Sequence, residues 1–281
     1  MKIDLIAFDL DGTTLNSKKK ISERNRLALR KAYEQGIKLV PCTGRSMYEF
    51  PNELNRFIDE FGFGVFPFVI TENGAQVYDL AQKKLLYTKS IPKETAKAIL
   101  LEGRKQLAVT YGSFGIMGAC DNAGLVWENN EVKPYLDDFL EKWNPSLANL
   151  EELIEWNDGL TKISMTFLNE ESYNKLFNFF STWPGLALSS SWENSIEIMT
   201  EGISKGEALT FVSRHIDIPL EHIMAIGDNL NDLEMIQCVK FGVAMENAIP
   251  VLKNNADWIT ASNDNDGFAL AIEKVLSKQD I

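Results

Sequence analysis

The sequence is poor in the residues that disulfide frameworks, histidine metal sites and membrane spans require. Only three cysteines occur among 281 residues, and they lie far apart, so we expect reduced thiols. The two histidines, His215 and His222, fall in an expected helix and the loop after it, and we expect both to be structural or solvent-facing. No apolar run reaches the roughly 18 residues of a membrane span, and no signal-peptide pattern is present. These absences predict a cytoplasmic protein without a membrane partner.

Positive charge is also scarce. The chain has 28 Lys and Arg against 40 Asp and Glu, which gives a formal net charge of -12. The densest basic stretch, Lys18-Lys19-Lys20, is expected in a surface loop. Because nucleic-acid binding demands a basic patch, we expect no nucleic-acid partner. A small phosphate ester remains an acceptable ligand, since a local metal and lysine can override the overall field.

The length and the order of apolar segments indicate two domains. A chain of 281 residues exceeds the usual size of one domain, and its 45% apolar and 24% charged content is ordinary for a globular protein. Strand and helix patterns alternate over residues 1–78 and again after residue 204, which is typical of βαβ units in a parallel sheet. We expect helices that begin at the caps Ser22 and Ser204, a helix from residue 45 to about 61, and a third parallel strand at 66–70.

Between about residues 81 and 190 the pattern changes to antiparallel strand signals and two amphipathic helices, at 93–105 and 171–180. This change predicts an inserted domain. We therefore expect an α/β protein in which a Rossmann-like parallel sheet core is interrupted by an inserted α+β cap domain. The expected limits are residues 1–81 and 191–281 for the core and 82–190 for the cap.

An apolar strand near the N-terminus ends in Asp9-Leu10-Asp11-Gly12-Thr13. Ligands of open α/β sheets bind beyond the carboxyl ends of the strands, so both acids stand where chemistry is usually done. Asp-Gly alone often marks an ordinary turn, but here one acid precedes the point where the turn is needed. Paired carboxylates suit Mg²⁺, which takes its remaining oxygens from water and substrate phosphate.

Three further signals fall at equivalent places, each at the end of an expected parallel strand or the start of the next helix. Singly, each has an ordinary explanation as a turn, a solvated lysine or a helix cap. Together they supply carboxylates, a hydroxyl, a cation and backbone amides, which are the parts that phosphoryl transfer requires. The three signals are Thr43-Gly44-Arg45, Lys205 and Gly227-Asp228-Asn229-Leu230-Asn231-Asp232.

With these motifs in this order, the sequence resembles the haloacid dehalogenase (HAD) superfamily, and within it the Cof-type phosphatases with a large, IIB-type cap. The resemblance covers nearly the whole chain. Thr14, Cys42 and Ser46 depart from the residues usual at their positions, but none of these changes removes a reactive group. Further matching segments are Glu72-Asn73-Gly74-Ala75, Gly202-Ile203-Ser204-Lys205-Gly206, Gly242-Val243-Ala244-Met245 and Asn247-Ala248.

The resemblance implies a role for each matching residue. Asp9 is the expected nucleophile, which forms an aspartyl phosphate, and Asp11 is the expected general acid and base. Mg²⁺ is expected on the Asp9 carboxylate, the Asp11 backbone carbonyl and Asp228. The expected phosphate-binding residues are Leu10, Thr43, Gly44, Lys205 and Asn231. Supporting or substrate contacts are expected from Arg45, Asp232 and Asn73.

The expected activity is Mg²⁺-dependent hydrolysis of small phosphorylated metabolites, either sugar phosphates or phosphorylated cofactors. Closure of the cap is expected to exclude water, and residues 111–127 are our candidate for a segment facing the substrate. Lys162 is expected to be structural.

Two other functions stay open. One is a sugar phosphomutase of the phosphomannomutase type. The other is a non-catalytic sensor of phosphate ligands, which the presence of an acid/base carboxylate disfavours. We expect a monomer or a weak homodimer.

Overall fold

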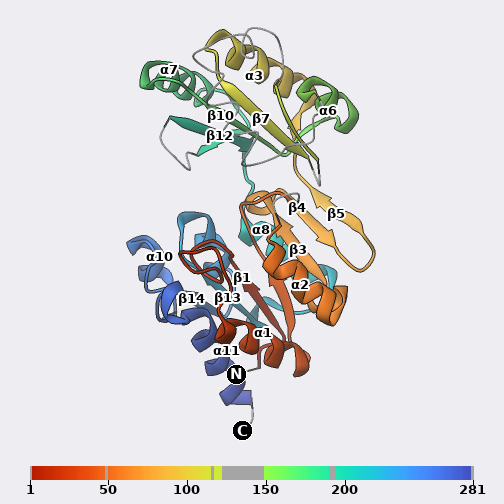
Figure 1. The fold of residues 1–281 in the computed structure, drawn as a ribbon, viewed down its shortest axis with the longest axis vertical. Coiled ribbons are helices and arrows are strands. Elements are labelled where there is room, and N and C mark those ends of the chain that lie inside the picture. Colours follow the sequence, from red (N-terminus) through yellow and green to blue (C-terminus); the bar gives the residue numbers. More distant parts are fainter. Residues whose placement is uncertain (1, 48–49, 115–116, 122–148, 190–193, 280–281) are drawn as a thin grey trace. The chain divides into compact units, whose positions relative to one another are not determined.

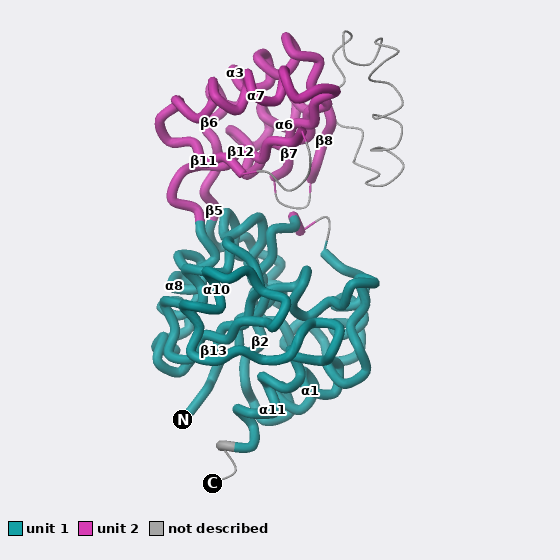
Figure 2. Tube along the Cα trace, turned by 90° about the vertical axis from the view of Figure 1, so that its left-hand side faces the viewer, with its two compact units in different colours: residues 1–45, 49–87, 204–281 teal, residues 46–48, 88–203 magenta. Residues whose placement is uncertain are grey.

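The computed structural model describes residues 2–47, 50–114, 117–121, 149–189 and 194–279. Contacts divide the chain into two compact units, one mainly of residues 1–87 and 204–281, the other mainly of residues 88–203 (Figure 2). We call them unit 1 and unit 2. Unit 2 is thus an insertion within unit 1. Its main part begins and ends later than the expected 82 and 190, because β5 (Lys84–Thr88) pairs within a sheet of unit 1 and β12 (Ser195–Thr200) continues the sheet of unit 2.

Unit 1 is built around a five-stranded sheet in the order β15-β14-β13-β1-β2, with every neighbouring pair parallel. β1 is completely buried, as expected of an apolar strand covered on both faces. The chain passes from β1 to β2 on one side and reaches β13, on the other side, only after the insertion. The strand order therefore reverses between β1 and β13, and ligands of such sheets bind at this reversal. The strands are β1 (Leu5–Phe8), β2 (Lys38–Pro41), β13 (Ile223–Gly227), β14 (Phe241–Ala244) and β15 (Trp258–Ile259).

Helices connect these strands, and two of them begin at the expected serine caps. Ser22 accepts a hydrogen bond from the Asn25 backbone N–H at 3.1 Å, and Ser204 accepts one from Glu207 at 3.1 Å. The helix expected directly after residue 45 begins only at Asn52, since proline at position 51 disfavours helical backbone before it. In unit 1, α1 packs against α11 (Figure 1), and α8 packs against α9. The helices are α1 (Glu23–Glu34), α2 (Asn52–Phe61), α8 (Lys205–His215), α9 (Leu233–Gln237), α10 (Pro250–Asn255) and α11 (Gly267–Gln279).

The third strand of unit 1 pairs differently from the expected parallel arrangement. β3 (Phe68–Thr71) forms a separate antiparallel sheet with β4 (Gln76–Asp79) and β5 (Lys84–Thr88). A single parallel bridge, between Cys42 and Ile70, links β3 to the end of β2. The reason is the tight turn directly after β3, which folds the chain back on itself before a crossover helix can form.

Unit 2 is an α+β unit with an antiparallel sheet in the order β11-β12-β10-β7-β8. Apolar side chains from the sheet and the helices, among them Leu100, Ile163 and Ile198, form its core. Lys162 lies on this sheet with its side chain 9% exposed, 3.8 Å from Glu197. The elements are β6 (Ile91–Pro92), α3 (Lys93–Lys105), β7 (Val109–Phe114), β8 (Met117–Cys120), α6 (Leu150–Asn157), β9 (Gly159–Leu160), β10 (Lys162–Thr166), α7 (Glu170–Phe180), β11 (Leu186–Ser189) and β12 (Ser195–Thr200).

The segment at 111–127, expected to be irregular, is a strand pair as far as Cys120. Of its glycines, Gly112 lies within β7 and Gly118 within β8, rather than at turns. A Cβ on Gly118 would lie 1.9 Å from the hydroxyl oxygen of Tyr111, so this glycine allows close packing across the pair. Residues 115–116 and 122–127 of the segment lie outside the described residues. Within the described part of the chain, no helix is both long and apolar enough to cross a bilayer.

Candidate active site

Segments that are distant in the sequence meet at the carboxyl end of the unit 1 sheet. Asp9 follows β1 and Asp228 follows β13, and these strands are parallel neighbours with Phe8 opposite Ile226. Lys205 is the first residue of α8, directly after the Ser204 cap. Unit 1 alone thus brings together three of the four predicted signals, and the fourth, at 43–45, follows β2 beside them.

Lys205 is a buried cation held between two carboxylates. Its side chain is 0% exposed, and Nζ lies 2.6 Å from Asp9 Oδ1 and 2.6 Å from Asp232 Oδ1. Burial alone would lower the pKa of this ammonium, but the charges of Asp232 and Asp9 outweigh it and raise the pKa above its usual range. Lys205 is therefore charged at neutral pH, as a buried lysine is when it is well paired.

The pKa of the buried Asp9 carboxyl is also raised, but for this group the shift disfavours the charged form. Its side chain is 8% exposed, and burial raises the pKa of the carboxyl well above its usual range. Lys205 opposes this shift, whereas the neighbouring charges of Asp232 and Asp228 add to it. The site therefore has more negative charge than its one buried lysine can balance, and a second cation would favour the ionised form of Asp9.

An acidic cluster supplies ligands for such a cation. Carboxylate oxygens of Asp9, Asp228 and Asp232 all lie within 4.8 Å of one another. The Thr13 hydroxyl donates to Asp228 Oδ1 at 2.7 Å, which fixes this side chain. Burial raises the pKa of Asp228 to about 6, although the Thr13 hydrogen bond works in the other direction. Oxygen donors of this kind suit a hard divalent ion.

Asp232 is already engaged within the protein. Oδ1 accepts from Lys205, and Oδ2 accepts from the backbone N–H groups of Asp228 at 2.9 Å and Asn229 at 3.0 Å. Asp232 therefore orients the lysine and the loop after β13. Asp9 and Asp228 remain as the better placed carboxylate ligands of the cluster.

The turn after β1 needs glycine. Gly12 has φ of 84°, and a Cβ there would lie 2.4 Å from Asp228 Oδ2. Asn247 Nδ2 donates to the Gly12 carbonyl at 2.8 Å, and the Leu15 backbone N–H donates to the Leu10 carbonyl at 2.8 Å. The turn is thus fixed against the Asp228 loop, and Leu10, a predicted phosphate-binding residue, lies at its base.

The Asp11 side chain lies outside the acidic cluster, although only one residue separates it from Asp9. Arg45 contacts both of its oxygens, with Nε 2.6 Å from Oδ2 and Nη2 2.7 Å from Oδ1, and Lys19 Nζ lies 2.7 Å from Oδ1. Burial by itself would raise the pKa of Asp11, but the hydrogen bonds from Arg45 and Lys19 outweigh it and lower the pKa to about 2. Asp11 is therefore ionised in this arrangement.

The remaining predicted residues form one hydrogen-bonded rim. Asn73, in the turn after β3, has φ of 58°, and its backbone N–H donates to the Thr43 carbonyl at 3.0 Å. Its side-chain oxygen accepts from Asn231 Nδ2 at 2.8 Å. A Cβ on Gly44 would lie 2.9 Å from that same oxygen, so the rim needs glycine here. The Thr43 hydroxyl accepts from the Arg45 backbone N–H at 3.1 Å.

Three contacts of this site do not follow from the sequence reasoning. Thr13 belongs to the first motif, so its hydroxyl, two residues beyond Asp11, could have indicated a contact in the site. Asn247 lies in a segment that matches the family, but this match does not indicate which group its side chain contacts. The contact of Lys19 with Asp11 could not be predicted, because a run of three lysines is typical of an exposed loop.

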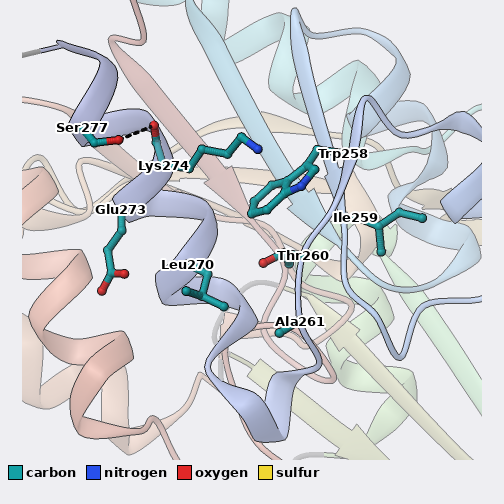
Figure 3. A pocket seen from close by; sticks show the side chains of 8 residues that line it. All are labelled: Trp258, Ile259, Thr260, Ala261, Leu270, Glu273, Lys274 and Ser277. Atoms are coloured by element: carbon teal, nitrogen blue, oxygen red, sulfur yellow. Dashed lines mark hydrogen bonds between the residues drawn. The ribbon is translucent and has the colours of Figure 1, made fainter. Parts of the chain in front are cut away.

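A hollow of about 510 Å³ lies elsewhere on unit 1, between β15 and α11 (Figure 3). Lys274 Nζ lies 3.8 Å from the centre of the Trp258 ring, a cation–π contact across its wall. None of the predicted site residues lines it. Its lining residues are Trp258, Ile259, Thr260, Ala261, Leu270, Glu273, Lys274 and Ser277.

Comparisons with known proteins show the family to which this chain belongs. A profile of haloacid dehalogenase-like hydrolases matches residues 6–272. The chain is 30% identical over 274 residues to the 5-amino-6-(5-phospho-D-ribitylamino)uracil phosphatase YcsE of Bacillus subtilis (strain 168), covering 96% of this chain and 94% of that protein. It is 31% identical over 293 residues to the phosphatase YwpJ of the same organism, covering 97% and 99%.

Among solved structures, a HAD subclass IIB sugar phosphatase matches 98% of both chains, with 25% sequence identity and a TM-score of 0.76. The α/β fold with an inserted cap and the family that the motifs predicted are both confirmed. The chain belongs to the haloacid dehalogenase-like hydrolases and is an enzyme of their phosphatase branch.

Proposed function

We propose that this protein is a Mg²⁺-dependent phosphatase that hydrolyses small phosphorylated metabolites through an aspartyl phosphate on Asp9. The observation that carries the proposal is the buried Lys205 ammonium, 2.6 Å from Asp9 Oδ1, beside an acidic cluster that includes Asp228. A carboxylate fixed in this way, with a cation and metal ligands beside it, is equipped to attack a phosphate ester.

The donor set fits Mg²⁺. Asp9 and Asp228 supply carboxylate oxygens, and the Asp11 backbone carbonyl is the third protein ligand in this proposal. When bound, the ion supplies positive charge to the carboxylates and to the phosphate oxygens. Lys205 alone does not balance the three carboxylates of the cluster, and a bound divalent ion would supply the missing positive charge.

Two steps follow for the residues of this chain. Asp9 attacks phosphorus in line, so that a P–O bond to Asp9 forms while the bond to the leaving alkoxide breaks. Water then attacks the same phosphorus, which releases inorganic phosphate and restores the Asp9 carboxylate. Lys205, the Thr43 hydroxyl and the Asn231 amide are the proposed contacts to the phosphate oxygens, together with the backbone N–H groups of Leu10 and Gly44.

Asp11 is the proposed acid and base. It gives a proton to the departing alkoxide and takes one from the attacking water. With a pKa of about 2, its side chain holds no proton at neutral pH while Arg45 and Lys19 contact it. Proton donation therefore requires a position of the Asp11 side chain in which at least one of these contacts is broken.

The proposed substrates are sugar phosphates or phosphorylated cofactors. This class is supported by the relatives, one named for a phosphorylated ribitylamino compound and one a sugar phosphatase. The test is phosphate release from a panel of phosphorylated metabolites, ranked by kcat/KM, with Mg²⁺ and then with EDTA. Release that is abolished by EDTA supports the proposal. Release from no ester, or release that EDTA leaves unchanged, contradicts it, and conversion of a hexose 1-phosphate to the 6-phosphate would indicate a mutase instead.

A further inference from the structure

Two cationic side chains contact the Asp11 carboxylate, and the proposed reaction assigns no role to one of them, Lys19. Arg45 already binds both of its oxygens, and Lys19 adds a contact of 2.7 Å to Oδ1. The Lys19 side chain is 63% exposed, so burial does not force it into this position. Its contact with Asp11 needs another explanation.

The loop that carries Lys19 is held in shape by its own hydrogen bonds. The Asn16 side-chain oxygen accepts from the Lys18 backbone N–H at 3.0 Å, and the Lys19 N–H donates to the Asn16 carbonyl at 2.9 Å. The Ser17 N–H donates to Asp264 Oδ1 at 2.9 Å, which joins the loop to the segment before α11. These hydrogen bonds hold the loop in the shape that places the Lys19 ammonium beside the Asp11 carboxylate.

The two acids of the first motif are separated in space by these contacts. Carboxylate oxygens of Asp9, Asp228 and Asp232 cluster together, whereas those of Asp11 do not join them. A carboxylate so close in sequence to a divalent ion is normally a ready ligand, because the ion favours oxygen donors and flexible side chains can reach it. Something must hold Asp11 away from the ion.

We propose that Lys19 is a positioning residue that keeps the Asp11 side chain out of the metal's ligand set and so reserves it for the leaving group. This inference rests on the proposed function for the metal and the leaving group. Lys19 acts by adding a second contact to Oδ1, beside the one from Arg45 Nη2. Without Lys19, the Asp11 side chain turns toward the ion and becomes an additional ligand.

The direct test is Mg²⁺ binding, measured by calorimetry on the full chain. Lys19→Met should bind Mg²⁺ about threefold more tightly than the unaltered protein, on the scale of one partly exposed ion pair. Lys19→Arg should restore the original affinity. Lys18→Met is the matched control, since it removes the same charge from the same loop, and its affinity should stay unchanged. Unchanged affinity in Lys19→Met would overturn the proposal.

A double-mutant cycle separates positioning from simple loss of charge. In an Asp11→Asn background, Lys19→Met should no longer tighten Mg²⁺ binding, because the carboxylate on which Lys19 acts is absent. An effect of equal size in both backgrounds would show that only charge matters, and the proposal would be wrong. Absence of any Mg²⁺ binding by the unaltered protein would overturn it as well.

The kinetic readout tells this inference apart from the proposed function. In Lys19→Met, kcat with p-nitrophenyl phosphate should fall while KM changes little, because an Asp11 side chain that binds the ion cannot serve the leaving group. This loss should outweigh the rise in the pKa of Asp11 that follows from removing the Lys19 contact. If the unaltered protein released phosphate from no ester while Lys19→Met still bound Mg²⁺ more tightly, the proposed function would fail and the positioning role would stand.

Discussion

The ammonium group of Lys205 lies 2.6 Å from Oδ1 of Asp9, although 196 residues separate them in the sequence. The contact is possible because the insertion ends directly before α8, so that the first residue of this helix belongs to unit 1 and reaches the carboxylate after β1. Unit 2 can therefore vary in sequence without changing these contacts.

Replacing Asp9 by Asn should abolish turnover, because the amide cannot form the aspartyl phosphate. The measurement is hydrolysis of p-nitrophenyl phosphate in excess Mg²⁺. The fold should persist, since the amide occupies the same volume and relieves part of the negative charge at the site. Activity equal to that of the unaltered protein would show that Asp9 is not the nucleophile.

Lys205→Met should lower the free energy of unfolding by about 3–5 kcal/mol at neutral pH, because Asp9 and Asp232 then remain buried without a cation. Added Mg²⁺ should recover part of this loss, since an ion that binds only the folded state stabilises it. Urea unfolding with and without Mg²⁺ measures both effects. Lys18→Met, which removes an exposed lysine, is the control and should unfold almost like the unaltered protein. A midpoint that Lys205→Met leaves unmoved would argue against a buried charged lysine.

Gly12→Ala tests the packing of the first motif against Asp228. Both Gly12 and Gly36 have positive φ, 84° and 80°, so alanine costs about 1–2 kcal/mol of backbone strain at either position. A Cβ on Gly12 would lie 2.4 Å from Asp228 Oδ2, whereas a Cβ on Gly36 meets nothing within 4 Å. Gly12→Ala should therefore lose Mg²⁺ binding and turnover, and Gly36→Ala should lose only stability. Equal activities of the two variants would show that the Asp228 contact is unimportant.

The sequence predicted the core sheet well because its strands are short, apolar and followed by polar residues of distinctive types. Ser22 and Ser204 likewise marked helix starts, since a serine hydroxyl satisfies a free backbone N–H group. The pairing of β3 was harder to predict. A tight turn and a crossover helix differ only in how Glu72 and Asn73 set their backbone angles, and both adopt positive φ here.

In the candidate site, too, some contacts could be predicted from the sequence and others could not. Parallel strands bring Asp9 and Asp228 to one edge of the sheet whatever the side chains do, so the motifs alone predicted that they meet. The position of Lys19 depends on a loop geometry set by Asn16 and Asp264, which no period or spacing in the sequence reveals. Long-range contacts made by exposed loops therefore needed the structure.

In metal-free protein, stability should depend on pH through Asp228. Its pKa is raised in the folded state from 3.8 to about 6, so the folded protein binds this proton more tightly than the unfolded chain does. The contribution of Asp228 to the free energy of unfolding should therefore fall as pH rises from about 4 to about 6. Asp228→Asn removes this dependence, so the stability of the unaltered protein relative to this variant should decline across that interval. Urea unfolding in EDTA at several pH values measures the difference, and a constant difference would contradict the raised pKa.

Mg²⁺ binding should show the opposite dependence on pH. A metal ligand must be deprotonated, and the proton on Asp228, with its pKa of about 6, competes with the ion. Apparent Mg²⁺ affinity should therefore weaken progressively as pH falls through about 6, while binding releases protons to the solution. Calorimetry in two buffers of different ionisation enthalpy counts these protons. The raised pKa of Asp9 works in the same direction, so the decline should be steeper than Asp228 alone would give. If affinity were the same on both sides of pH 6, these carboxylates would not be the metal ligands.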